Sequence, residues 1–194
     1  MIIKNYVIED HLIDYSNKPC KIGRMVRDGK YYRIIRGLYE TDPETPGQYI
    51  AQAICNPSYL SFEYALSKYG LIPEAVFGFT SASFRKKRQK EYDTPFGYFT
   101  FKDVPDAVFP YGVRFVSEKD RGYWIADPEK ALCDKVYTIS PVGSERAMRT
   151  LLFEDLRIDE DGFSELDTNE LTKLSTIYGS KNVRLLAKIR EKMR

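Results

Sequence analysis

The chain has 194 residues, of which 43 % are hydrophobic and 30 % charged, and its formal net charge is +2. These values are typical of a soluble globular protein of one or two domains, and the near-neutral total requires any nucleic-acid surface to be a local patch. No apolar run approaches the roughly 18 residues of a membrane span, and no signal peptide opens the chain, so we expect no membrane partner.

The three cysteines, Cys20, Cys55 and Cys133, form no CxxC motif and no paired spacing. An odd, scattered set argues against a disulfide framework and indicates a reducing compartment, so we expect a cytoplasmic protein whose cysteines are small buried hydrophobes. The single histidine, His11, excludes a metal site built from several histidines.

In chain order, residues 5–15 predict a helix with Tyr6, Val7, Leu12 and Ile13 near one another. Residues 16–17 end this helix and can cap the next one, in which Pro19 falls near the first turn where proline is tolerated.

Residues 18–39 carry a basic residue at every third position and only one acid, which gives a local net charge of +6. The first half predicts a short helix with Ile22, Met25 and Val26 on one face, closed by Gly29 in the left-handed region. The second half, residues 31–39, predicts a hairpin with a tight turn at 36–37.

A basic-faced helix followed by a basic hairpin is typical of a winged helix-turn-helix, with the helix in the major groove and the wing on the backbone. A charged outer face is more commonly only a solvated surface, but seven positions of one sign favour phosphate contact. We expect Arg24 and Arg27 to contact bases, because arginine matches the paired acceptors of guanine. The expected DNA contacts are Lys18, Lys21, Arg24, Arg27, Lys30, Tyr32, Arg33 and Arg36.

Residues 41–47 contain two prolines and a glycine and are the best linker in the chain. We therefore expect a winged helix-turn-helix domain at 1–45 and a mixed C-terminal domain at 48–194 that is helical from 144, an α+β protein. Within the C-terminal domain we expect helices at 48–55 and 58–69. We expect strands at 75–82 and 97–102 and a hairpin of 113–116 with 123–126.

A second basic run precedes residue 90, in a predicted loop or strand end. A solvated loop explains it about as well as a nucleic-acid or partner contact. Its members are Arg85, Lys86, Lys87 and Arg88.

Residues 127–137 predict a helix that Asp127 caps, with Lys130 and Asp134 paired across one turn. Carboxylates beside a lysine can also hold Mg²⁺, so a metal-dependent nuclease centred on Glu129 and Asp134 is an alternative. However, Glu129 and Lys130 are adjacent on the predicted helix, so their side chains diverge by about 100°. This favours a structural role for these residues. No phosphate-binding loop, GxGxxG, GxSxG or zinc-ligand spacing is present, so we expect neither an enzyme nor a metal or cofactor.

The helical remainder contains an acidic belt and a basic final helix that runs to 194. A protein-interaction module within 144–194 is a third hypothesis, although two opposite charge runs can simply pair with each other. The belt consists of Glu154, Asp155, Asp159, Glu160, Asp161, Glu165, Asp167 and Glu170, and the final helix carries Lys181, Arg184, Lys188, Arg190, Lys192 and Arg194.

Four motifs in order span nearly the whole chain: RGLY at 36–39, PSYLS at 57–61, YGLIPE at 69–74 and IADPEKAL at 125–132. With these residues the chain resembles the AbiE-type antitoxins, the DNA-binding halves of type IV (abortive-infection) toxin–antitoxin pairs used in phage defence. The motif positions are Ser58, Ser61, Gly70, Pro73, Glu129, Lys130 and Asp134.

The resemblance implies an N-terminal winged helix that binds operator inverted repeats in double-stranded DNA and represses its own operon. It also implies a C-terminal domain that counteracts a nucleotidyltransferase-like toxin, without a stable complex between the two proteins. Only one helix fits before the basic helix, so the helix-turn-helix is abbreviated relative to this pattern.

Overall fold

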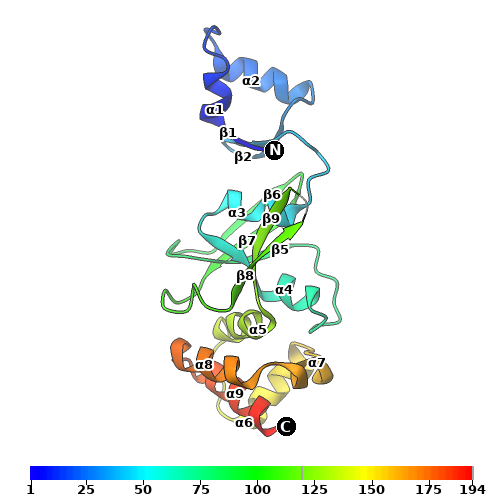
Figure 1. Ribbon diagram of the computed structural model, residues 1–194, viewed down its shortest axis with the longest axis vertical. Coiled ribbons are helices and arrows are strands. Elements are labelled where there is room, and N and C mark those ends of the chain that lie inside the picture. The colour runs from blue at the N-terminus through cyan, green and yellow to red at the C-terminus, as the bar shows by residue number, and fades with distance from the viewer. Residues whose placement is uncertain (119, 194) are drawn as a thin grey trace.

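The structure, a computed structural model, describes residues 1–118 and 120–193. It is an elongated α+β protein with a small N-terminal unit at one end, a six-stranded sheet in the middle and a group of helices at the other end (Figure 1). The α+β class predicted from the sequence is confirmed. Within the described residues, no helix is both long enough and apolar enough to cross a membrane.

The N-terminal unit contains two helices and a three-stranded antiparallel sheet with the order β1-β3-β2. The short strand β1 was not predicted, because three residues are too few to show an alternating pattern. The elements are β1 (Ile2–Lys4), α1 (Asn5–Asp10), α2 (Lys18–Arg27), β2 (Tyr32–Ile35) and β3 (Leu38–Glu40).

A small core holds α1 and α2 against this sheet. Its buried members are Ile8, Leu12, Ile22 and Tyr39. Tyr6 and Ile13, which were expected near Val7 and Leu12 on one helix, are 67 % and 73 % exposed and lie outside this core. The helix ends at Asp10, so the helical spacing used for that prediction does not continue to residue 15.

The ends of α2 are those expected from its sequence. The Asn17 side chain accepts a hydrogen bond from the Cys20 amide at 3.1 Å, which satisfies one free donor of the first turn. Pro19 lies in that turn, where its missing N–H costs nothing, and Gly29 follows the helix with φ of +70°.

The two faces of the small sheet pack against different parts of the molecule. The Tyr39 side of the sheet faces α1 and α2, and Arg33 is paired with Tyr39 across the strands. On the other side, Ile34 and Leu38 belong to the main hydrophobic core of the protein. The hairpin is therefore packed on the C-terminal part and does not project freely.

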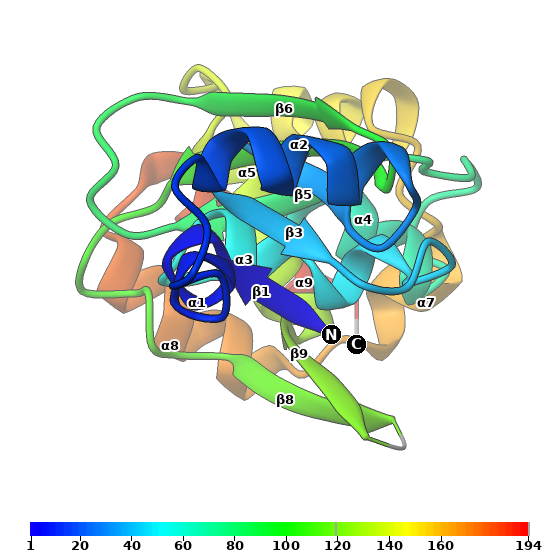
Figure 2. The same cartoon turned by 90° about the horizontal axis from the view of Figure 1, so that it is seen from above.

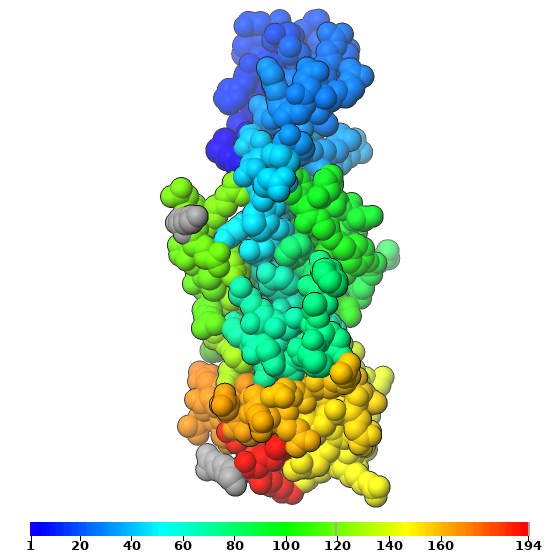
Figure 3. All heavy atoms as spheres, turned by 90° about the vertical axis from the view of Figure 1, so that its right-hand side faces the viewer, coloured from blue at the N-terminus to red at the C-terminus, as the bar shows by residue number. Residues whose placement is uncertain are grey.

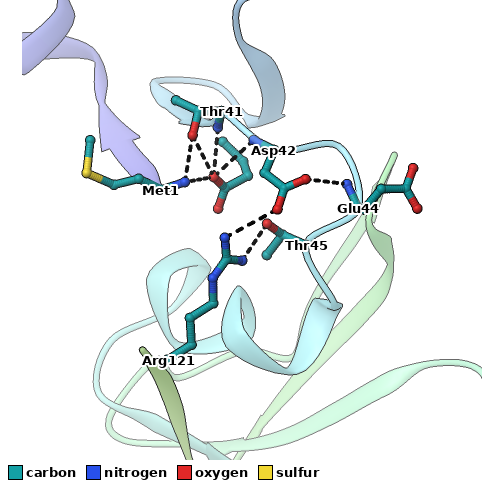
Figure 4. Close-up of polar contacts among 7 residues, drawn as sticks. Met1, Thr41, Asp42, Glu44, Thr45 and Arg121 are labelled. Carbon is teal, nitrogen blue, oxygen red and sulfur yellow. Dashed lines mark hydrogen bonds and ion pairs between the residues drawn. The ribbon is translucent and has the colours of Figure 1, made fainter. Parts of the chain in front are cut away.

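The segment between β3 and the larger part is fixed by polar contacts (Figure 4). The Arg121 guanidinium donates to the Thr45 hydroxyl at 2.5 Å and reaches the Asp42 carboxylate at 3.4 Å. The buried Glu40 carboxylate accepts hydrogen bonds from the Met1 amino group and the Thr41 amide. Burial alone would raise the pKa of Glu40, but these hydrogen bonds outweigh it and leave that pKa lowered.

The central sheet has the strand order β6-β7-β5-β4-β9-β8. The pairs β4–β9 and β5–β7 are parallel, and the other neighbours are antiparallel. Its strands are β4 (Ser58–Leu60), β5 (Phe79–Ser83), β6 (Lys90–Thr94), β7 (Gly97–Asp103), β8 (Val113–Glu118) and β9 (Arg121–Ala126), and the helices η1 (Gly47–Tyr49), α3 (Ala51–Ile54) and α4 (Phe62–Lys68) accompany them.

The helix predicted at 58–69 is wrong in its first part and right in its second. Residues 58–60 form β4 in the middle of the sheet, between β5 and β9, and all three are buried. The sequence could not show this because the apolar spacing of α4 extends by chance into the strand. The strand predicted at 75–82 begins only at Phe79, whereas the strand predicted at 97–102 is confirmed as β7, in which Phe99 and Phe101 are buried.

The far end of the molecule is helical, as predicted. Asp167 caps α8 and Gly179 ends it with φ of +59°. The prediction that Asp127 caps α5 is wrong: its carboxylate reaches Arg114 instead, at 3.3 Å. The helices are α5 (Pro128–Tyr137), α6 (Glu145–Arg149), η2 (Thr150–Asp155), α7 (Glu160–Glu165), α8 (Thr168–Tyr178) and α9 (Lys181–Lys192); Arg194 lies outside the described residues.

Two of the three cysteines, Cys55 and Cys133, are buried as expected, and no thiol of the three is in a disulfide. Cys20 is exposed on α2, which corrects the expectation for that residue. It follows Pro19 in the first turn, on the outer side of a helix whose inner side is already filled by Ile22.

Candidate nucleic-acid interface

The outer face of α2 carries the residues predicted to read bases. Arg24 and Arg27 are exposed, while Ile22 on the inner face is buried in the small core. Lys18 and Lys21 lie on the flank of the helix and are half-buried, and the Lys21 ammonium sits 4.9 Å from the Tyr15 ring centroid. The helix thus presents two exposed arginines in its second half and two lysines along one side.

Three further cations come from the hairpin and the turn before it. Lys30, Arg33 and Arg36 are exposed. The Arg33 guanidinium lies 5.9 Å from the Tyr39 ring centroid, on the side of the sheet that faces α2.

A hollow of about 500 Å³ is lined by residues of the hairpin and of the two helices. Arg33 and Arg36 line one side, Gly23 and Val26 of α2 another, and α1 contributes the carboxylate of Glu9. The turn of the hairpin is tied to α1 by the Asn5 amide, which donates to the Gly37 carbonyl at 2.9 Å. Arg33 and Arg36 are therefore held beside α2 on a fixed backbone.

Tyr32 is the predicted contact that the structure separates from the others. It is half-buried and packs against the main core, on the opposite side of the sheet from Arg33. Because neighbouring residues of a strand point to opposite faces, Tyr32 and Arg33 cannot serve one surface.

Within the described residues, none of the seven cations of residues 18–36 forms an ion pair with a carboxylate. Their charge is therefore not neutralised inside the molecule, which is the condition for releasing counterions on binding phosphate. Seen from above, α2 lies nearest the viewer and the rest of the molecule lies behind it (Figure 2). The space-filling view likewise shows the N-terminal unit at one end of the molecule (Figure 3).

The second basic run forms the loop between β5 and β6, and part of it is used in local contacts. Arg85 pairs with Asp106 at 2.6 Å, and the Lys86 ammonium donates to the Asn56 carbonyl at 2.8 Å. The backbone amide of Lys87 donates to the Asp103 carboxylate. The side chains of Lys87 and Arg88 are exposed. A second nucleic-acid or partner contact at this loop stays a prediction.

Lys130 and Asp134 pair across one turn of α5 at 2.9 Å, and both are completely buried. The Ser61 and Tyr59 hydroxyls donate to the second Asp134 oxygen at 2.7 and 3.1 Å. The Lys130 ammonium also donates to the Tyr178 hydroxyl at 2.6 Å, and that hydroxyl donates to Asp134. This Lys130–Asp134 cluster joins β4, α5 and α8 with the residue that precedes α4.

Sequence reasoning missed Tyr59 and Tyr178 because each lies far along the chain from the pair. Burial, and after it the Asp134 carboxylate, raises the pKa of both tyrosines well above 10.0. Both hydroxyls therefore stay protonated and able to donate. Tyr59 and Ser61 both lie in the PSYLS motif at 57–61, but only Ser61 was singled out from it, and Tyr178 lies outside all four motifs.

Glu129, the other residue of the nuclease hypothesis, points away from this cluster. Its carboxylate accepts a hydrogen bond from the Asp167 amide at 2.8 Å. Among the described residues, no group of three acidic, histidine or cysteine side chains is arranged to hold a metal ion. The contacts of Glu129 and Asp134 are structural, and the nuclease alternative stays a prediction for assay.

Two of the three remaining motif positions, Ser58 and Gly70, have local structural roles. The Ser58 hydroxyl donates to the Cys55 carbonyl at 2.5 Å, and Gly70 ends α4 with φ of +70°. Pro73 is exposed in the following loop.

The two C-terminal charge runs do not pair with each other within the described residues. Lys188 and Lys192 of α9 both reach Glu145 of α6 at 2.6 Å, and Arg190 donates to the Leu166 carbonyl. In the acidic belt, Asp159 and Asp167 cap α7 and α8. The interpretation that the runs neutralise each other is therefore wrong.

No protein-family model matches this chain, and no curated protein gives a significant sequence match.

Proposed function

We propose that the chain is a DNA-binding antitoxin of a type IV toxin–antitoxin system, which represses its own operon and counteracts a nucleotidyltransferase-like toxin. The DNA-binding part rests on the row of cations on α2 and the hairpin after it, which pair with no carboxylate of the described residues. The antitoxin part rests on the resemblance of the sequence motifs.

We further propose that the N-terminal unit is an abbreviated winged helix-turn-helix. The order of strand, two helices and a hairpin, with the first strand added to the sheet beside β3, supports this assignment. In this proposal α1 supports the recognition helix α2, and the β2–β3 hairpin is the wing.

In this arrangement Arg24 and Arg27 enter the major groove of duplex DNA, and Lys18 and Lys21 contact phosphate along one side of α2. Lys30, Arg33 and Arg36 contact the backbone beside the hairpin. Tyr32 contributes through packing of the wing on the main core, because its side chain faces that core.

The test is a binding titration of the full chain on the DNA upstream of its own coding sequence and on a scrambled duplex. Arg24→Ala should cost about 1–3 kcal/mol on the native sequence and reduce the preference over the scrambled one. Lys30→Ala should weaken both duplexes alike and lower the slope of log affinity against log salt by about 1.

Arg184→Ala is the matched control, because Arg184 is exposed on α9 at the opposite end of the molecule. It should leave both affinities unchanged. If Arg24→Ala and Arg27→Ala bind like the native chain, α2 is not the recognition helix. Co-expression with the adjacent gene product then tests the antitoxin part separately, since rescue of growth does not require DNA binding.

A further inference from the structure

The β8 strand forms one edge of the central sheet and has a neighbour on only one side, β9, among the described strands. An edge strand offers a row of N–H and C=O groups to another strand. Among the described residues, those of β8 make no backbone hydrogen bond outside their pairing with β9. From above, β8 lies at the margin of the molecule (Figure 2).

An exposed aromatic pair lies on one face of this edge. Phe115 and Trp124 face each other across β8 and β9 with ring centroids 5.3 Å apart, and they are 52 % and 41 % exposed. A second strand at this open edge would cover two large apolar side chains that are already in contact.

The opposite face of β8 carries one charge of each sign. Arg114 and Glu118 both alternate with Phe115 and Ser117, and both are exposed. They are placed symmetrically about Val116, two residues to either side. Charges on an edge strand normally deter pairing with an arbitrary strand, but this spacing is complementary to itself.

We propose that β8 pairs with β8 of a second copy of this chain, antiparallel and centred on Val116. In that register Arg114 of each copy lies opposite Glu118 of the other, and Phe115 lies opposite Ser117. Opposite charges directly across an antiparallel pair attract, whereas any register shifted by two residues loses the match. The interface is isologous, so both charge pairs form at once.

The pairing also fixes where the N-terminal units lie. Each β8 begins beside α5, where Gly112 packs on Lys130, and its hairpin returns at Arg121, which holds Asp42. Antiparallel pairing therefore directs the two N-terminal units toward opposite ends of the paired strands.

The test uses sedimentation velocity of the full chain and of two charge reversals, over a range of protein concentrations. Arg114→Glu alone places two glutamates opposite each other across the interface, and Glu118→Arg alone places two arginines opposite each other. Each should weaken the dimer about tenfold, since cross-strand attraction becomes repulsion twice over. An equimolar mixture of the two variants should restore it, because every cross-strand pair is then of opposite sign.

The mixture is the decisive measurement, because both residues also make contacts within their own chain. Arg114 reaches Asp127 and Tyr69, and Glu118 accepts from Tyr49, and mixing restores none of these contacts. Arg184→Glu is the control and should dimerise like the native chain. A monomeric native chain, or a mixture no more associated than each variant alone, would overturn the proposal. The DNA affinity of the two variants is measured separately, and it tests the proposal for α2 and not the proposal for β8.

Discussion

The charged residues that lie deepest in this protein are Lys130 and Asp134. A lysine and an aspartate four apart on a helix are usually an exposed pair, but α5 is packed against β9, α4, α8 and α9. Removing both charges from water is costly, and only additional hydrogen bonds offset that cost. Tyr59, Ser61 and Tyr178 supply them, so the pair is stable only as part of the complete cluster.

Removing the charge of one partner should lower the free energy of unfolding far more than replacing both partners with apolar residues. We expect Asp134→Asn to lower the free energy of unfolding by about 3–5 kcal/mol, because the Lys130 ammonium is left buried without a counter-charge. Replacing both residues, as Lys130→Met with Asp134→Leu, should recover a large part of that loss. Urea denaturation followed by circular dichroism measures both.

Lys135→Met provides the comparison, because Lys135 is one residue further along α5 and its pair with Glu63 is only half-buried. Its loss should be below about 1 kcal/mol, as for other solvent-screened pairs. An Asp134→Asn variant as stable as Lys135→Met would show that the cluster is not ionic.

At the scale of single elements, α2 is the helix whose sequence and structure agree most fully. The sequence predicted its cap, its first-turn proline, its apolar inner face and its closing glycine. Each of these features is set by residues within one turn of the helix. Such local signals survive folding when no other element competes for the same backbone.

The sequence could not decide whether Ser16 or Asn17 caps α2, and the structure assigns the cap to Asn17. Asn17→Ala should lower the stability of the N-terminal unit by about 1 kcal/mol, because the Cys20 amide loses its acceptor. Ser16→Ala is the matched control, since Ser16 is exposed and the cap is already supplied. Thermal unfolding by circular dichroism would contradict the assignment if Ser16→Ala were the more damaging change.

The strand β4 shows the opposite case. Its three residues sit between two other strands, and that position depends on β5 and β9, which come later in the chain. Helical spacing in the residues that follow it outweighed any strand signal in so short a segment.

At the scale of the whole molecule, the N-terminal unit and the central sheet are joined by packing as well as by the chain. Ile34 and Leu38 of the hairpin are part of the main core, and Arg121 fixes the connecting segment. The surface formed by α2 is therefore presented at a set orientation relative to the sheet.

Because the hairpin shares the main core, we expect a core substitution in the hairpin to destabilise the central sheet as well. Leu38→Ala should lower the free energy of unfolding by about 2–5 kcal/mol as reported by the fluorescence of Trp124, the only tryptophan, which lies in β9. Ile22→Ala, an equally buried change in the small core, should shift the Trp124 transition less. Equal shifts, or no shift for Leu38→Ala, would contradict a core shared by the two parts.

The candidate interface was predicted in composition but only partly in geometry. Helical periodicity placed Arg24 and Arg27 outward, because the apolar residues of α2 define its inner face. The orientation of the hairpin could not be predicted in the same way, since both of its faces carry apolar residues. Neighbouring strand residues point to opposite faces, and packing of Ile34 and Leu38 in the main core decides that Tyr32 faces that core and Arg33 faces α2.

The sequence by itself determined the α+β class, the basic row at the N-terminus and both ends of α2, because these depend on composition and on residues close together in the chain. Tertiary structure alone decided that the hairpin packs on the main core, that β4 is a central strand and that Lys130 and Asp134 are enclosed. Each of these depends on segments tens of residues apart meeting in space, and the free energy of burying apolar surface there outweighs local preference.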